Sequence, residues 1–163
     1  GHYITGPELS KFEQDLAYFC GAEYGVGVSS GTSALHLILS SLDLKEGDEV
    51  ITAPNSFIAS ASTIALAGGK PVFSDVGPDM NLDPELLEAA ITPKTRAIIP
   101  VHLTGRPAKM GKILEIAKLH NLFVIEDAAQ AIGTKLDGKH VGSWGDPHPH
   151  PCRKWGEYSP PHM

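Results

Sequence analysis

A Ser- and Gly-rich segment, residues 29–34 (Ser-Ser-Gly-Thr-Ser-Ala), follows a short apolar run and opens a strongly apolar helical pattern. Backbone N–H groups at the start of a helix, with the positive end of the helix dipole, bind phosphate. Gly31 lets the backbone approach a ligand closely, and Thr32 adds a hydroxyl donor. The segment therefore predicts a phosphate site, or else an N-cap that only stabilises the helix by about 1 kcal/mol. It is neither a P-loop, because no Gly-Lys-Ser/Thr follows, nor a G-x-G-x-x-G dinucleotide fingerprint.

Two adjacent acids, Glu126 and Asp127, directly follow the apolar run 122–125, and Gln130 comes shortly after them. An acid at the carboxyl end of a buried parallel strand is costly to bury unless it meets a cation. A protonated pyridine nitrogen is a suitable partner. The alternative is an acid that caps the next turn.

An aromatic ring and an imidazole follow two further apolar runs. Phe57 comes after residues 49–53, where a ring can stack on a planar cofactor, and ordinary core packing is the alternative. His102 ends the run 96–102, where it contacts a substrate or cofactor or is a satisfied structural histidine.

Alternating helical and strand patterns position these four segments. Spacing, caps and composition predict helices over 7–20, 32–42, 57–67, 83–90 and 107–120, and strands over 25–28, 49–53, 71–76, 96–102 and 122–126. This alternation predicts an α/β fold with a mostly parallel sheet flanked by helices. Ligands of such sheets bind beyond the carboxyl ends of the strands, which is where the four segments lie.

The composition bounds the classes of partner. The chain has 163 residues, with 13 Lys and Arg against 19 Asp and Glu, a net charge of −6. An acidic chain without a basic stripe argues against nucleic acid, and no apolar run is long enough to span a bilayer. The two cysteines make no disulfide framework, and the first residues do not resemble a signal peptide. We therefore expect a cytoplasmic protein.

Taken together, the motifs resemble the DegT/DnrJ/EryC1/StrS family of sugar aminotransferases, which use pyridoxal 5′-phosphate (PLP). The resemblance covers about nine-tenths of the chain and rests on YITGPELSKFE (3–13), VSSGTSALHL (28–37), GDEVITAPNSFIAS (47–60), GGKPVFSDV (68–76), LLEAAITPKTRAIIPVHLTG (86–105), VIEDAAQAIG (124–133) and VGSWGD (141–146). It implies an incomplete large domain of the aspartate-aminotransferase-like fold (PLP fold type I). Residues 1–146 are expected to form this partial domain, and 147–163 an irregular tail rich in Pro and His.

The resemblance also implies roles for particular residues. Asp127 pairs with the pyridine nitrogen, Phe57 stacks on the ring, and Gln130 lies beside the ring and its phenolic oxygen. His102 lies near the site, on the side of the substrate. The remaining residues form the phosphate cradle: Gly31, Thr32 and Ser33.

The lysine that forms the Schiff base in the family is out of register here. The family's His-Pro matches His150-Pro151 only if three residues are deleted, and Arg153 then falls on the lysine position. Arginine cannot be deprotonated in a protein, so Lys154, one residue later, is the catalytic candidate.

Two other interpretations concern the same tail. Some relatives are dehydratases with histidine in place of the lysine, a part that His148 or His150 would then take. A metal cluster of His148, His150, Cys152 and His162 fits no standard zinc spacing, so we expect no metal.

The implied activity is transfer of an amino group from an amino acid, with glutamate expected, to a keto-sugar attached to a nucleotide. The family's proteins are more than twice this length and build their site across a homodimer, so this chain is expected to be an incomplete form. The alternatives are a catalytically inactive fragment that serves as a cofactor-binding or dimerisation module, and a PLP-dependent sugar dehydratase.

Overall fold

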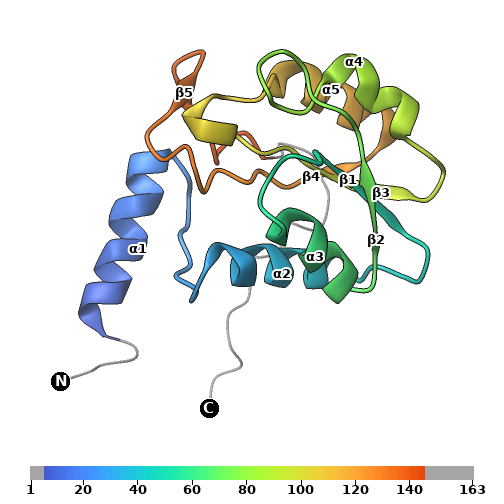
Figure 1. The fold of residues 1–163 in the computed structure, drawn as a ribbon. Helices are drawn as coiled ribbons and strands as arrows, with labels where there is room; N and C mark the ends of the chain where they lie inside the picture. Colours follow the sequence, from blue (N-terminus) through green and yellow to red (C-terminus); the bar gives the residue numbers. More distant parts are fainter. Residues whose placement is uncertain (1–5, 146–163) are drawn as a thin grey trace.

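The fold is built on a four-stranded parallel sheet, seen in a computed structural model that describes residues 6–145 (Figure 1). The strands lie in the order β2-β1-β3-β4, and all three pairings are parallel. Their bounds are β1 (Glu49–Thr52), β2 (Lys70–Phe73), β3 (Thr95–Ile99) and β4 (Phe123–Val124). The predicted α/β architecture with a mostly parallel sheet is confirmed.

Helices cover both faces of this sheet. The described helices are α1 (Pro7–Cys20), α2 (Gly31–Ser41), α3 (Ala59–Leu66), α4 (Pro84–Leu87) with η1 (Glu88–Ala90), η2 (Leu103–Gly105) and α5 (Met110–His120). Helix α1 lies to one side of the sheet and does not cover either face (Figure 1). Among residues 6–145, none of these helices combines the length and the apolar character that a bilayer crossing requires.

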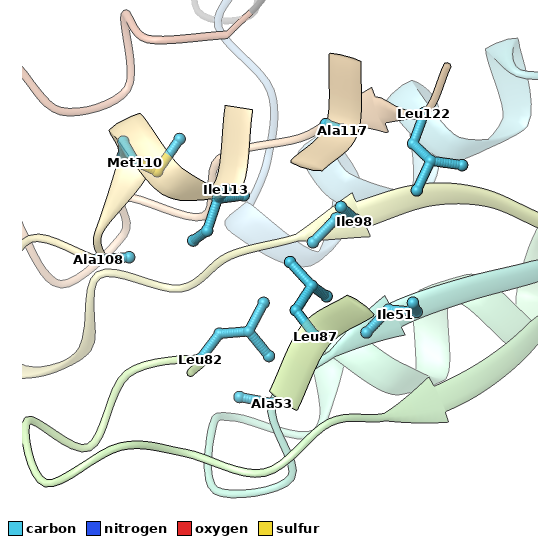
Figure 2. Packing of buried hydrophobic residues seen from close by; sticks show 10 residues of the cluster. All are labelled: Ile51, Ala53, Leu82, Leu87, Ile98, Ala108, Met110, Ile113, Ala117 and Leu122. Carbon is cyan, nitrogen blue, oxygen red and sulfur yellow. The ribbon is translucent and has the colours of Figure 1, made fainter. Parts of the chain in front are cut away.

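Alternate residues of each strand point to opposite faces and join different clusters. On one face, α4 and α5 pack on the sheet, and Figure 2 shows Ile51 and Ile98 beside Leu87 of α4 and Ile113 of α5. On the other face, α2 and α3 pack on Val50, Ala97 and Ile99 of the strands and on Ile125, directly after β4. The faces to which residues 126 and 127 point follow from this alternation.

Local signals set most helix ends. Asp83 caps α4 by accepting a hydrogen bond from the Glu85 N–H, and a proline follows at the first helical position. Gly21 and Asn121 end α1 and α5 in the left-handed conformation, with φ of 70° and 56°. Helix α5 begins at Met110 rather than at the predicted Pro107, because the preceding segment is held by contacts to Asn81.

The predicted strand over residues 25–28 is wrong. This segment lies against α1 without strand structure: the Gly27 N–H donates to Glu13 Oε1 at 2.7 Å, and a Cβ on Gly25 would meet the Glu13 carbonyl oxygen at 2.6 Å. Val26 is 80% exposed. A strand needs a partner edge, and none of the described strands pairs with this segment.

A short hairpin, β5 (Lys135–Leu136) with β6 (Lys139–His140), was not among the predicted elements. Its turn is Asp137-Gly138, with φ of 50° and 81°. Two left-handed residues of this type make the turn that suits a two-residue hairpin.

Candidate functional site

The carboxyl ends of β3 and β4 continue as hydrogen-bonded backbone beyond the strands themselves. The Asp127 N–H donates to the Pro100 carbonyl at 2.9 Å, and the His102 N–H donates to the Asp127 carbonyl at 3.0 Å. This pairing fixes the backbone of the Glu126-Asp127 segment against the end of β3. Because Ile125 packs on the α2 and α3 face, Asp127 points to that face and Glu126 to the opposite one.

Asp127 is held by a hydroxyl from α3. Ser60 Oγ donates to Asp127 Oδ2 at 3.1 Å, and the Ala129 N–H donates to Oδ1 at 3.2 Å. Ser60 is 1% exposed, so its hydroxyl is withdrawn from water, whereas Asp127 stays partly exposed. Ser56 Oγ lies 3.4 Å from Ser60 Oγ and extends the chain of hydroxyls. Within residues 6–145, no basic side chain forms an ion pair with Asp127, so this oriented carboxylate is open to a cationic ligand group.

His102 is a satisfied structural histidine. Its side chain is 0% exposed, Nε2 lies 3.1 Å from Glu126 Oε2, and Nδ1 accepts the Ala108 N–H at 3.0 Å. Of the two interpretations from the sequence, the structure supports the structural one. The expectation that His102 faces a substrate is therefore corrected: both ring nitrogens are engaged inside the protein.

Gln130 is oriented by the turn after His102. The Thr104 N–H donates to Gln130 Oε1 at 3.0 Å, which leaves the amide NH₂ group as the free end of the side chain. Thr104 adopts a left-handed φ of 54°, and Thr134 Oγ1 donates to the carbonyl of Gly105 at 2.9 Å. The Gln130 segment and the η2 turn are thus tied together beside the end of β3.

Phe57 is 66% exposed, so the alternative of ordinary core packing is wrong. It lies two residues before α3, and its carbonyl accepts the Ser60 N–H at 3.1 Å. The exposed ring of Phe57 is thus close in the chain to Ser60, the residue of the first turn of α3 that holds Asp127. This placement is compatible with stacking on a planar ligand.

The segment 29–34 caps α2, as predicted. Ser30 Oγ accepts the Ser33 N–H at 3.1 Å, so Ser33 is engaged in the cap itself. The amides of Gly31 and Thr32 belong to the first turn, where helical geometry provides them no acceptor. A Cβ on Gly31 would meet no atom within 4 Å, and both Gly31 and Thr32 are exposed, so a ligand can approach this first turn. Figure 1 shows that α2 begins on the same side of the molecule as η2, which follows β3.

The structure therefore joins some predicted residues through contacts and leaves others apart. The backbone of His102 bonds to that of Asp127 beyond the ends of β3 and β4, and Gln130 is held by Thr104 in the turn after His102. Phe57 lies two residues before α3, the helix that supplies Ser60. Lys154, the expected catalytic lysine, and the tail residues His148, His150, Cys152, Arg153 and His162 lie outside the described residues. In the described part, no group of three His, Cys, Asp or Glu is arranged to hold a metal ion. An open hollow of about 500 Å³ lies between α1 and residues 22–25, and none of the predicted site residues lines it.

Sequence reasoning missed Ser60 and, although it named Glu126 beside Asp127, did not distinguish the roles of these two acids. Ser60 holds Asp127 from 67 positions away, and Glu126 is buried against His102. Ser60 lies within the predicted helix 57–67, and the two-residue period of strands separates Glu126 from Asp127. Both patterns can be seen in the sequence, but neither shows that Ser60 bonds to Asp127 or that Glu126 bonds to His102.

The family model of the DegT/DnrJ/EryC1/StrS aminotransferase family matches residues 1–148. A pleiotropic regulatory protein of Geobacillus stearothermophilus is 51% identical over 144 residues, which are 88% of this chain and 39% of that protein. UDP-2-acetamido-2-deoxy-3-oxo-D-glucuronate aminotransferase of Pseudomonas aeruginosa is 49% identical over 140 residues, which are 85% of this chain and 39% of that protein. The chain thus spans about two fifths of the length of these relatives.

Solved structures show the same fold. DesV of S. venezuelae, in complex with a ketimine intermediate, superposes with a TM-score of 0.84 at 45% identity over 87% of this chain and 38% of that one. NtdA of Bacillus subtilis with bound cofactor PMP superposes with a TM-score of 0.80 at 40% identity over 87% of this chain and 32% of that one. The predicted fold, part of an aspartate-aminotransferase-like domain, is confirmed.

Proposed function

The chain belongs to the DegT/DnrJ/EryC1/StrS aminotransferase family, and we propose that it supplies the cofactor-binding edge of a PLP-dependent sugar aminotransferase. The reaction is transfer of an amino group from an amino acid, glutamate in our proposal, to a nucleotide-linked keto-sugar. The observation that carries this proposal is the Asp127 carboxylate, oriented by Ser60 at the carboxyl end of β4 and without a basic partner within residues 6–145.

The described residues fit PLP in charge and shape. The cofactor has a phosphate, a flat ring, a basic ring nitrogen and a phenolic oxygen. The open first turn of α2 at Gly31 and Thr32 suits the phosphate, and the exposed ring of Phe57 suits the flat face. The Asp127 carboxylate suits the ring nitrogen, and the free NH₂ of Gln130 suits the phenolic oxygen.

In this proposal each residue acts on one part of the cofactor. Asp127 holds the proton on the pyridine nitrogen, and Ser60 holds Asp127 in place. Gln130 donates to the phenolic oxygen, and Phe57 covers one face of the ring. Gly31 and Thr32 bind the phosphate, while the Ser33 N–H is held by the Ser30 cap. When bound, PLP supplies an electron sink for the carbon that loses its proton.

Lys154 is the proposed residue for covalent attachment, in the tail that follows the partial domain 1–146. Histidine relatives that act as dehydratases share the cofactor, so retention of PLP alone does not separate the two activities. The Pseudomonas aeruginosa relative is a UDP-2-acetamido-2-deoxy-3-oxo-D-glucuronate aminotransferase, which supports amino transfer as the reaction of this chain.

We further propose that the protein acts as a homodimer in the cytoplasm. Exposed apolar side chains on α1 and in the segment that follows it support association, because such surfaces are often buried between subunits. These side chains are Phe12, Phe19, Val26 and Val28. Light scattering of the purified chain measures the mass directly, and a monomer at all concentrations would contradict the dimer.

The first experiment is an absorbance titration of the 163-residue chain with PLP, followed by removal of the excess and borohydride reduction. We expect retained cofactor that borohydride fixes to a peptide containing Lys154, and at least about tenfold weaker binding in Asp127→Asn, which loses the charge. Amino transfer is then assayed with glutamate and a panel of nucleotide keto-sugars. A chain that retains no PLP refutes the proposal, and retention without any amino transfer assigns a cofactor-binding module instead.

A further inference from the structure

Glu126 is a buried carboxylate that joins three parts of the chain. Its side chain is 4% exposed and accepts hydrogen bonds from three N–H groups. His102 Nε2 lies at 3.1 Å and the Gly142 amide at 2.7 Å from Oε2, and the Gly145 amide lies at 2.5 Å from Oε1. The donors come from the loop after β3 and from the turn 142–145, so a single side chain ties both to the end of β4.

The histidine in this network has a defined proton. A backbone amide can only donate, so His102 Nδ1, which accepts the Ala108 N–H, carries no proton. The proton is therefore on Nε2, and the neutral ring donates to Glu126. A carboxylate that receives three N–H donors is stabilised without a cation, which is what a 4% exposed acid requires.

Glu126 and Asp127 are adjacent in the chain but serve opposite faces of the sheet. Asp127 meets Ser60 of α3, whereas Glu126 meets His102 and the turn 142–145. The turn itself lies beside β4: a Cβ on Gly145 would stand 3.8 Å from both Glu126 Oε1 and the Val124 carbonyl oxygen. Any movement of Glu126 therefore moves both the backbone next to Asp127 and the point from which the chain continues after Gly145.

We propose that Glu126 is a positioning residue of the cofactor-binding edge: it anchors the turn 142–145 and, through His102, the loop that leads to Ala108, and so fixes where Asp127 stands. The cofactor part of this inference rests on the proposed function. The anchoring part does not, and it is tested on the chain without cofactor.

Glu126→Gln tests the anchor by removing one acceptor. Glutamine has one carbonyl oxygen and one NH₂, so it cannot accept from His102 and Gly142 on one side and from Gly145 on the other. The N–H of Gly142 or of Gly145 then faces the NH₂ group of the glutamine, which is also a donor, and loses its acceptor. Glu49→Gln is the matched control: Glu49 is also buried, at 6% exposure, but it starts β1 at the opposite end of the sheet and bonds to Lys70 and Thr92.

Three quantities are measured on chains labelled with ¹⁵N-glycine: the exchange rate of the Gly142 and Gly145 amide protons, the affinity for PLP, and the melting temperature. We expect at least one of the two amides to exchange about tenfold faster in Glu126→Gln than in Glu49→Gln, the order expected for the loss of a hydrogen bond to a charged group. We expect PLP to bind about tenfold more weakly to Glu126→Gln than to Glu49→Gln.

Equal exchange and equal affinity in the two variants would overturn the proposal. If the parent chain retains no PLP, the proposed function fails, and the exchange rates alone decide whether Glu126 anchors the turn. If Glu126→Gln does not fold, His102→Gln and His102→Leu replace it, since glutamine keeps an N–H donor and leucine does not. Faster exchange at Gly142 in the leucine variant supports the anchor, and identical exchange in both overturns it.

Discussion

Replacing Ser60 by alanine is the sharpest test of how the site holds Asp127. The Ser60 hydroxyl is buried and donates to Asp127 Oδ2 at 3.1 Å. A hydrogen bond to a charged group is worth about 1.5–3 kcal/mol, and about 1.4 kcal/mol corresponds to a factor of ten in affinity. The Ala129 N–H still holds Oδ1, so the carboxylate is loosened rather than lost. We therefore expect Ser60→Ala to weaken PLP binding by about tenfold to a hundredfold.

The assay is a PLP titration followed by absorbance, with three controls. Ser60→Thr keeps the hydroxyl and is expected to retain most of the affinity. Ser56→Ala removes a hydroxyl that lies 3.4 Å from Ser60 Oγ and not on Asp127, so we expect a smaller loss. In the Asp127→Asn background, Ser60→Ala should add little, because the two residues act as one unit.

The reasoning is refuted if Ser60→Ala binds PLP like the parent chain, or if its loss is the same with and without the Asp127 carboxylate. In the second case the effect would come from the cavity at α3 and not from the hydrogen bond. Melting curves of each variant separate a general loss of stability from a local loss of affinity.

Three further predictions concern stability. Ile98→Ala, at a side chain that is 0% exposed between the strands and α5, should cost about 2–5 kcal/mol in urea unfolding, and a loss below that range would contradict the packing. Asn81→Ala should cost about 3 kcal/mol, since the side chain donates to the carbonyls of Arg106 and Pro107 and accepts the Leu103 N–H; an unchanged urea midpoint would be inconsistent with that role. The Thr92 hydroxyl, and then Lys70, hold the pKa of Glu49 below its usual 4.5. This stabilisation is present above pH 4.5 and is lost as the pH falls through the lower folded-state pKa, so acid should destabilise the parent chain more than Glu49→Gln; equal acid sensitivity would count against it.

Features that depend on neighbouring residues were predictable from the sequence. Helix α1 spans Pro7–Cys20 as predicted, because a proline at its start and a left-handed glycine after its end define both limits. Strand β1 begins at Glu49 as predicted, where a buried apolar run starts. These signals lie within or next to the element that they define, so the sequence of that segment is enough to predict its limits.

Features that depend on distant partners were not predictable in the same way. The segment 25–28 has the apolar composition of a strand, but a strand is defined by its hydrogen-bonded neighbour, and none of the described strands pairs with it. Its Gly27 N–H bonds instead to Glu13 on α1. The β5 and β6 hairpin is the reverse case, because its Asp137-Gly138 turn was visible in the sequence and the strands on either side are too short to show a period.

The candidate site shows the same division. The sequence places Asp127, Gln130 and His102 after strands, and the structure brings these positions together at the ends of β3 and β4. Which side chain meets which could not be inferred, since Ser60 and Asp127 are 67 positions apart and His102 and Glu126 are 24 apart. That missing information decides which of the two acids is open to a ligand.

The two adjacent acids explain why this sheet edge can combine rigidity with binding. A carboxylate whose partners are all internal N–H groups gains stability from them but offers nothing to a ligand, and Glu126 is in that position with three donors. A carboxylate that keeps one hydroxyl and one amide, and stays partly exposed, is oriented but retains acceptor capacity, as Asp127 does. Successive residues of a strand point to opposite faces. One backbone segment can therefore carry both an anchoring carboxylate and a ligand-binding carboxylate, because the two side chains have different neighbours. Asp127→Asn should therefore weaken PLP binding while leaving the turn 142–145 in place, because Glu126 and its three donors are unchanged. PLP binding at the affinity of the parent chain in this variant would show that the open carboxylate is not what receives the cofactor.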